Sequence, residues 1–90
     1  MRFALICTDK PDHLEVRKAN RDAHLAYISE TGVVEMAGPL LNAEGAMAGS
    51  LIVLEVEDLA TAQGWAKNDP YNKADLFQSV AINAWNKVIG

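Results

Sequence analysis

Two stretches of the sequence are apolar at successive positions, and this feature limits the possible folds more than any other. They are Phe3 to Cys7 and Leu51 to Leu54. Because neighbouring side chains of a β-strand point to opposite faces of a sheet, strands of this kind need cover on both faces. The chain has 90 residues, of which 50% are hydrophobic, so we expect one small globular domain spanning residues 1–90. A domain of this size has little material with which to cover both faces of its sheet.

The first third of the chain predicts a strand followed by a long helix. Phe3 to Thr8 is a short apolar run followed by the turn residues Asp9-Lys10-Pro11-Asp12, which is typical of a strand. No glycine or proline occurs from His13 to Glu30, so a helix is expected there, ending at Gly32. Asp12 is expected to cap this helix, and Glu15 would complete a capping box.

The middle of the chain predicts a hairpin of two strands. Val33 to Leu41 is apolar but contains Gly38-Pro39, which indicates a bend and suits an edge strand, since proline lacks the N–H that a central strand needs. Ser50 to Glu57 is predicted as the next strand. The small residues from Asn42 to Gly49 would form the loop between them.

The last third predicts a shorter helix and a final strand. Asp58 is expected to cap a helix from Leu59 to about Asn68. A turn from Asn72 to Asp75 and a strand from Phe77 to Asn86 would follow Pro70.

The resulting order is strand, helix, strand, strand, helix, strand, which is the split βαβ pattern of the ferredoxin-like fold. We therefore predict an α+β fold, βαββαβ, with a four-stranded antiparallel sheet and two helices on one face. Two helices leave the other face of the sheet uncovered. We predict that a second copy covers it, giving a homodimer by sheet-to-sheet packing.

Charge and composition argue against several classes of partner and site. The net charge is −4 and the basic residues are not clustered, so neither nucleic acid nor a membrane surface is expected as a partner. No stretch predicts a membrane span or a signal peptide, and a cytoplasmic protein is expected. Cys7 is the one cysteine and lies in an apolar run, which indicates a buried structural thiol. His13 and His24 lack the neighbours of a metal site, and no phosphate-binding loop occurs, so no metal or cofactor is expected.

The stretch Trp65-Ala66-Lys67-Asn68-Asp69-Pro70-Tyr71 places a carboxylate at the end of the second predicted helix. Proline disfavours the α conformation in the residue before it, so Asp69 is expected to leave the helix and point away from its solvated surface. In a split βαβ fold the two helices lie side by side, which can bring Asp69 near His24 in the first helix. A carboxylate bonded to one ring nitrogen orients the imidazole and leaves the other nitrogen free to move a proton.

At 3.6 residues per turn, Leu14, Leu25 and Ile28 form the apolar stripe of the long helix. Arg17, Arg21 and His24 border this stripe. The ordinary interpretation of the two arginines is that their stems lie on apolar surface and their charged ends reach water. The alternative is a polar recess between helix and sheet, in which all three side chains face a ligand. The arginines alone favour the ordinary interpretation.

Several segments, taken in order, resemble a known family. They are Arg17, His24-Leu25-Ala26-Tyr27-Ile28, Ala37-Gly38-Pro39-Leu40, Gly49-Ser50 and Trp65-Ala66-Lys67-Asn68-Asp69-Pro70-Tyr71, and together they look like the YciI-like (YCII-related) family. The resemblance spans nearly the whole chain. It implies a dimeric α+β barrel built from ferredoxin-like subunits and related to the muconolactone isomerases.

The same resemblance implies an active site in which His24 and Asp69 pair within a pocket. Ser50 and the turn at Gly38-Pro39 match further pocket residues. A dehydrochlorinase acting on a chlorinated hydroxyquinol is among the activities attached to this family.

Two hypotheses from different classes follow. In the first, a small cofactor-independent enzyme uses His24, oriented by Asp69, as a general acid/base on a small cyclic or aromatic substrate, in an isomerisation, an elimination or a hydrolysis. In the second, a pocket binds a small molecule without turnover, and the His24–Asp69 pair is a structural hydrogen bond. In the enzyme, Arg17 would hold a substrate anion, and Ser50 and Tyr71 would donate hydrogen bonds. The full set of expected substrate-binding residues is Arg17, Arg21, Ser50, Gly38, Pro39 and Tyr71.

Overall fold

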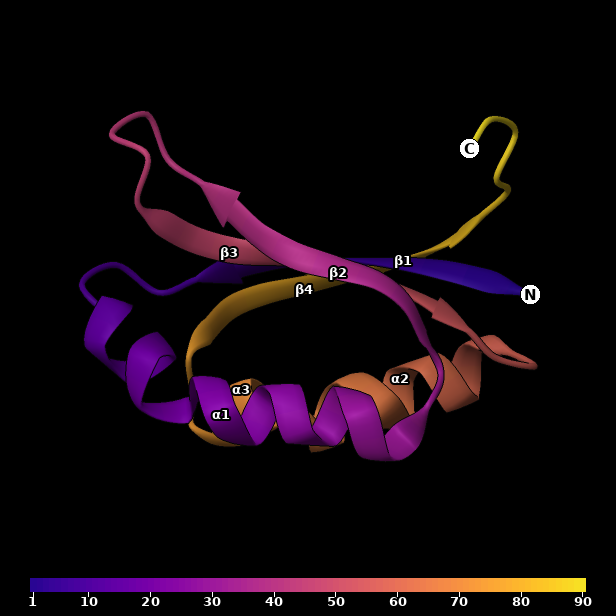
Figure 1. Ribbon diagram of the computed structural model, residues 1–90, viewed down its shortest axis with the longest axis horizontal. Helices are drawn as coiled ribbons and strands as arrows, with labels where there is room; N and C mark the ends of the chain where they lie inside the picture. Colours follow the sequence, from indigo (N-terminus) through magenta and orange to yellow (C-terminus); the bar gives the residue numbers. More distant parts are fainter.

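The computed structural model describes residues 1–90 as a sheet with all of its helices on one side (Figure 1). The strands are β1 (Arg2–Asp9), β2 (Val34–Leu41), β3 (Met47–Glu55) and β4 (Phe77–Trp85). The helices are α1 (Leu14–Thr31), α2 (Leu59–Asn68) and α3 (Pro70–Lys73). The strand order is β2-β3-β1-β4, and each pair of neighbours is antiparallel. The predicted ferredoxin-like α+β fold is therefore confirmed.

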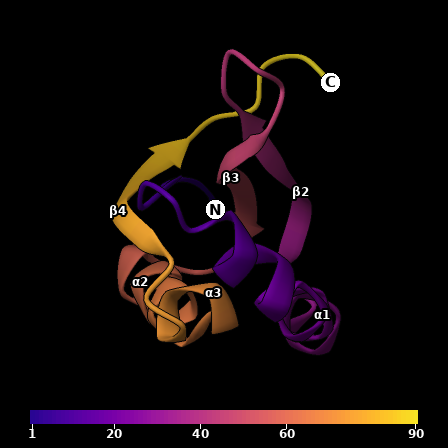
Figure 2. The same cartoon turned by 90° about the vertical axis from the view of Figure 1, so that its left-hand side faces the viewer.

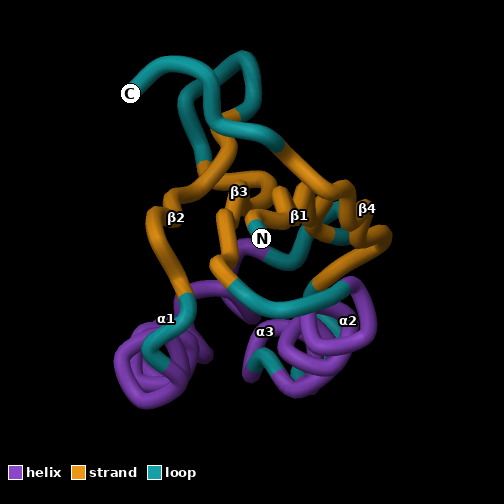
Figure 3. Tube along the Cα trace, turned by 90° about the vertical axis from the view of Figure 1, so that its right-hand side faces the viewer, coloured by secondary structure: helices purple, strands orange, loops and turns teal.

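The core lies between the sheet and the helices, which occupy the same side of the sheet in two further views (Figures 2 and 3). Phe3, Leu5 and Cys7 point from β1 into this layer, and Ile52 and Leu54 join them from β3. All five are almost fully buried. Burying one such side chain stabilises the fold by about 1.5 to 3 kcal/mol, so this alternation determines which face of the sheet packs on the helices.

The opposite face of the sheet carries apolar side chains that no helix covers. We call it the open face, and it consists of Ala4, Ile6, Met36, Leu40, Leu51, Val53 and Ala81. Met36 is 51% exposed and Ile6 is 38% exposed, whereas Val53 in the middle of the sheet is only 2% exposed. Successive apolar residues in β1 and β3 thus supply one inward and one outward apolar surface, as their pattern predicted.

The C-terminal end of α1 agrees with the prediction, whereas the N-terminal cap does not. Gly32 adopts the left-handed conformation, with φ 66°, and its N–H donates to the carbonyl of Ile28, as predicted for a helix stop. The predicted capping box is wrong, because Asp12 has φ 59° and lies in a turn before the helix. His13 takes the cap position without a capping side-chain hydrogen bond.

The region around α2 and α3 shows why the second helix is broken. Asp58 caps α2 by accepting the N–H of Thr61 at 2.9 Å, as predicted. Asp69 has an extended backbone, with φ −60° and ψ 128°, as expected for a residue before proline. The residues after it form the short helix α3, because Pro70 suits the first helical position. The turn predicted from Asn72 to Asp75 is therefore limited to Ala74 and Asp75.

The hairpin of β2 and β3 has a shorter loop than predicted, since β3 begins at Met47 and not at Ser50. β2 is an edge strand, which confirms the interpretation of Pro39. Its pairing with β3 shifts register between Val34 and Met36 and again between Leu40 and Leu41. No helix has the combination of length and apolar character that crossing a bilayer requires.

Gly49 is required where β3 approaches β1, and this yields a stability prediction. A Cβ at Gly49 would overlap the carbonyl oxygen of Cys7, whereas a Cβ at Gly64 in α2 would meet nothing within 4 Å. Gly49→Ala should therefore lower the free energy of unfolding by about 1 to 3 kcal/mol, the usual cost of overpacking. Gly64→Ala should raise it by about 0.5 to 1 kcal/mol through helix propensity. Urea unfolding of both variants checks this, and equal stability of the two would contradict it.

Candidate functional site

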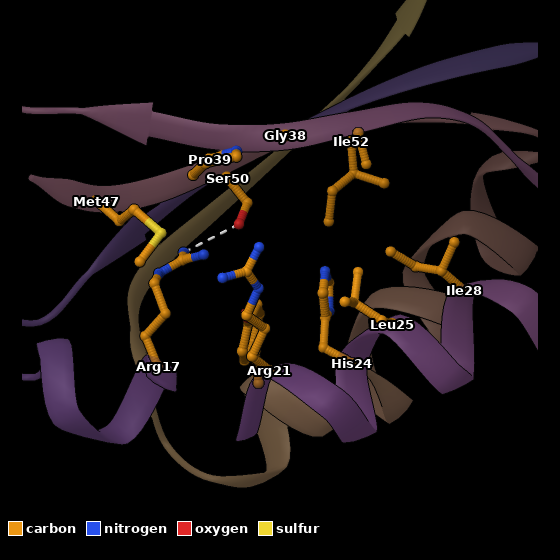
Figure 4. Close-up of a pocket in the computed structure, with 12 residues that line it drawn as sticks. Arg17, Arg21, His24, Leu25, Ile28, Gly38, Pro39, Met47, Ser50 and Ile52 are labelled. Atoms are coloured by element: carbon orange, nitrogen blue, oxygen red, sulfur yellow. Dashed lines mark hydrogen bonds between the residues drawn. The ribbon is translucent and has the colours of Figure 1, made fainter. Parts of the chain in front are cut away.

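A cavity of about 210 Å³ lies between α1 and the strands β2 and β3. Figure 4 shows Arg17, Arg21 and His24 extending from α1 toward Ser50 and Ile52 on the sheet. The residues that line the cavity are Arg17, Arg21, His24, Leu25, Ile28, Ala37, Gly38, Pro39, Met47, Ser50, Ile52 and Tyr71. Every predicted site residue except Asp69 is in this set, and Asp69 lies behind His24. The recess between helix and sheet that we considered as an alternative is therefore present.

His24 and Asp69 form a buried hydrogen-bonded pair. The distance from Nδ1 of His24 to Oδ1 of Asp69 is 2.7 Å, and the two residues are 6% and 1% exposed. The same Oδ1 accepts the backbone N–H of Tyr71 at 3.0 Å. Because this oxygen accepts from the backbone, the carboxylate acts as the acceptor and Nδ1 of His24 as the donor. Asp69 thereby selects the tautomer of the imidazole.

The second ring nitrogen of His24 is free. Every side-chain nitrogen or oxygen that is sealed from solvent has a hydrogen-bond partner, whereas Nε2 of His24 has none. Nε2 is therefore accessible from the cavity, and Figure 4 shows the tip of the ring directed at the strands. In the tautomer that Asp69 selects, Nε2 carries the lone pair that can accept a proton.

Tyr71 is packed between two residues of α1. Its ring stacks on His24, with centroids 4.0 Å apart and planes 16° apart, and the guanidinium carbon of Arg17 lies 4.7 Å from its centroid. Arg17 and His24 are seven residues apart, which is two helical turns and about 10 Å, so one ring fits between them. Burial raises the pKa of Tyr71, although Arg17 and Arg21 oppose the shift, so the phenol remains a donor at neutral pH.

Arg17 is tied to β1 and β3 instead of reaching water. Its Nε and Nη2 donate to the two carboxylate oxygens of Asp9 at 2.7 and 2.8 Å, and Nη2 also donates to Oγ of Ser50 at 2.9 Å. Burial disfavours the charged guanidinium, but Asp9 outweighs it, so the pKa of Arg17 is raised. The ordinary interpretation of Arg17 is wrong, because the end of β1 supplies a buried partner for its charge.

Arg21 differs from Arg17, since it is exposed and takes part in no ion pair. Its guanidinium extends into the cavity between Arg17 and His24 (Figure 4). Gly38 and Pro39 border the cavity from β2. The two arginines of α1 thus have different surroundings, which their spacing did not predict.

Sequence reasoning missed one polar residue and the apolar wall of the site. Asp9 was assigned to a turn, but it is the last residue of β1 and lies beside Arg17. The available signal for this contact was its position directly after a buried strand, in a chain whose next helix carries arginines. Leu25 was placed in the apolar stripe but is 50% exposed at the cavity. The other apolar lining residues that were not assigned to the site are Ile28, Ala37, Met47 and Ile52.

Cys7 lies close to the site without taking part in it. It is buried, as predicted, and burial raises the pKa of its thiol to about 12, with Asp69 adding to the shift and Arg17 opposing it. A thiol with this pKa is a poor nucleophile at neutral pH. No group of three or more His, Cys, Asp or Glu side chains is arranged to hold a metal ion.

The buried pair of Arg17 and Asp9 yields a second stability prediction. Asp9→Asn should lower the free energy of unfolding by about 3 to 5 kcal/mol, because it leaves the charge of Arg17 buried without a counter-charge. Replacing both, with Asp9→Leu and Arg17→Met, should cost less. Asp75→Asn is the matched control, since its partner Lys10 lies on the surface. Urea unfolding that ranks Asp75→Asn level with Asp9→Asn would show that burial of the pair is unimportant.

Comparison with known proteins identifies the family. The YCII-related domain matches residues 1–86. Protein YciI of Escherichia coli O6:H1 is 36% identical, over 98% of this chain and 99% of that protein. A 5-chloro-2-hydroxyhydroquinone dehydrochlorinase from Burkholderia phenoliruptrix AC1100, solved with 2,5-dihydroxybenzoquinone, has a TM-score of 0.88 and 33% identity, over 96% of this chain and 94% of that chain. An antibiotic biosynthesis monooxygenase shares only the fold, with a TM-score of 0.61 and 7% identity over 98% of both chains. The chain belongs to the YCII-related domain family.

Proposed function

We propose that this protein is a small cofactor-independent enzyme in which His24 is the general acid/base and Asp69 its orienting partner. The observation that carries the proposal is the state of the imidazole, whose Nδ1 is held by a buried carboxylate while Nε2 faces a cavity. A histidine that served only to join two helices would not need a free nitrogen directed at open space. This is the feature that favours the enzyme over the non-catalytic alternative.

The chemistry that the site supports is proton transfer on a small cyclic or aromatic substrate. Nε2 of His24 would take a proton from the substrate, and the imidazolium so formed would be stabilised by the Asp69 carboxylate. Return of that proton to another atom gives an isomerisation, and departure of a leaving group gives an elimination. Hydrolysis would use the same nitrogen to activate a water molecule. Tyr71 and Ser50 carry hydroxyl groups at the cavity that can donate hydrogen bonds to substrate oxygens.

The similarity to the dehydrochlorinase supports elimination as the first reaction to test. That relative is named for its action on 5-chloro-2-hydroxyhydroquinone, and it is 33% identical to this chain. A substrate of one ring also suits a cavity of about 210 Å³. We therefore choose 5-chloro-2-hydroxyhydroquinone as the first candidate substrate, followed by small lactones, other quinols and haloaromatics.

We also propose that two copies associate through the open face. Its apolar side chains have no cover within one chain, and a second copy that packs sheet to sheet would bury them. The sheet of a 90-residue chain would then be covered on both sides, which its apolar strands favour.

The acid/base role of His24 predicts a large loss of turnover on its removal. His24→Ala should lower kcat by about a hundredfold to ten-thousandfold on any substrate that the parent converts, measured as chloride release from 5-chloro-2-hydroxyhydroquinone or as product formation in the wider screen. Asp69→Asn should also lower kcat, because the imidazolium loses its counter-charge.

Tyr27→Phe is the matched control for this experiment. The Tyr27 hydroxyl donates to the backbone carbonyl of Trp65 at 2.9 Å, so it also joins α1 to α2 but lies outside the cavity lining. Its activity should equal that of the parent. Full turnover by His24→Ala would remove the proposed role, and binding without turnover across the screen would favour the non-catalytic pocket.

The proposed dimer predicts a mass of two chains in solution, measured by light scattering at micromolar concentration. Ile6→Glu should shift the protein toward the monomer, because it places a charge in the middle of the open face. Leu59→Glu is the control, since Leu59 is also exposed but starts α2 on the opposite side of the molecule. A parent protein that is monomeric at this concentration would refute the proposal.

A further inference from the structure

The charges around the cavity are unequally compensated, and this difference indicates what binds there. Arg17 is held by both carboxylate oxygens of Asp9, and both side chains are nearly buried. Asp69 is held by His24 and by the N–H of Tyr71. Each of these two acidic groups therefore has its partner within the protein. Arg17 and Asp9 neutralise each other. Asp69 keeps its charge beside the neutral imidazole, but it is only 1% exposed and lies behind His24, outside the cavity lining.

Arg21 is the cation of the cavity that has no counter-charge. It lies one turn after Arg17 and one turn before His24 on the same face of α1, and it forms no ion pair. Figure 4 shows its guanidinium extending from α1 toward the strands, between the ends of Arg17 and His24. A guanidinium binds the oxygens of an anion with charge-assisted hydrogen bonds, which are stronger than those between neutral groups. One uncompensated cation matches a single negative charge.

The rest of the cavity selects for an apolar ligand body of limited size. Leu25, Ile28 and Ile52 lie on the His24 side of the cavity (Figure 4). The volume of about 210 Å³ corresponds to about seven molecules of liquid water, which is the space of one ring with few substituents. A phosphate group would bring a second negative charge that no free cation of the cavity matches.

We infer that the substrate is a monoanion with a single ring, whose charged oxygen is bound by Arg21 and whose ring lies against Leu25, Ile28 and Ile52. This rests on the proposed function and makes it more specific. It moves the anion contact from Arg17, where the sequence placed it, to Arg21. Arg21 also lies close enough along α1 to His24 to hold an oxyanion beside the atom that Nε2 protonates or deprotonates.

Binding of benzoate and benzamide tests this inference, because the two have the same ring and similar shape but differ in charge. Isothermal titration calorimetry at low salt should show binding of benzoate to the parent, and binding of benzamide at least about tenfold weaker. Arg21→Gln should weaken benzoate binding by about tenfold or more and leave benzamide unchanged. The affinity of the parent for benzoate should fall as salt is added.

Lys18→Gln is the matched control, since it removes the same charge from the same helix outside the cavity lining. Its affinity for benzoate should stay within about twofold of the parent, whereas a general effect of net charge would lower it as much as Arg21→Gln does. The inference is overturned if benzoate does not bind, if benzamide binds equally well, or if Arg21→Gln binds benzoate like the parent.

The outcome is independent of the acid/base proposal. Selective binding of benzoate that depends on Arg21, without turnover of any substrate in the screen, would support the anion contact at Arg21 and count against the acid/base role of His24. Turnover of an uncharged substrate that needs His24 and is unaffected by Arg21→Gln would support the acid/base role of His24 and refute the anion contact at Arg21.

Discussion

The carboxylate of Asp69 is the contact on which the site depends. One of its oxygens accepts hydrogen bonds from His24 in α1 and from the backbone of Tyr71 in α3. The same residue ends α2 and caps α3, because Pro70 forces its backbone into an extended conformation. A single residue thus joins three helices and determines the orientation of the imidazole. Tyr71 follows it directly, which places the phenol ring against His24.

A second buried charge, that of Arg17, connects the same helix to the sheet. Its guanidinium bonds to Asp9 at the end of β1 and to Ser50 on β3, and it packs on Tyr71. Burying an ion pair costs desolvation that its attraction barely repays, so such pairs are a weak source of stability. In this small chain two buried acidic groups and their partners lie at one cavity. A hydrophobic core does not need such a concentration of buried charge. A binding or catalytic site does, because the pairs hold the side chains that line the cavity in one arrangement.

The difference between Arg17 and Arg21 shows how a fold assigns separate roles to similar residues. They are four positions apart on α1, so a helical wheel places them on the same face. Arg17 meets the end of β1 and is neutralised there, whereas Arg21 forms no ion pair. The first stabilises the wall of the cavity, and the second is available to a ligand.

Local signals in the sequence determined most of the fold. Apolar runs, Gly32 and Asp58 predicted the strands, the end of α1 and the start of α2, since these depend on backbone preferences and on neighbours a few residues away. Pro70 predicted that Asp69 would leave its helix, and the split βαβ order then indicated His24 as its partner. The failed capping box at Asp12 and the unpredicted helix α3 depend on turn geometry, which composition specifies poorly.

Tertiary structure alone decided how the side chains of the site are used. Asp9 and Arg17 are eight residues apart on different elements, and only the packing of α1 on the sheet brings their charges together where both side chains are nearly buried. The apolar lining of Met47 and Ile52 likewise comes from a strand distant in sequence from α1. A sequence shows which residues can carry a charge or a proton. Which of them is neutralised, and which faces an open cavity, follows from distances and burial that exist only in the folded chain.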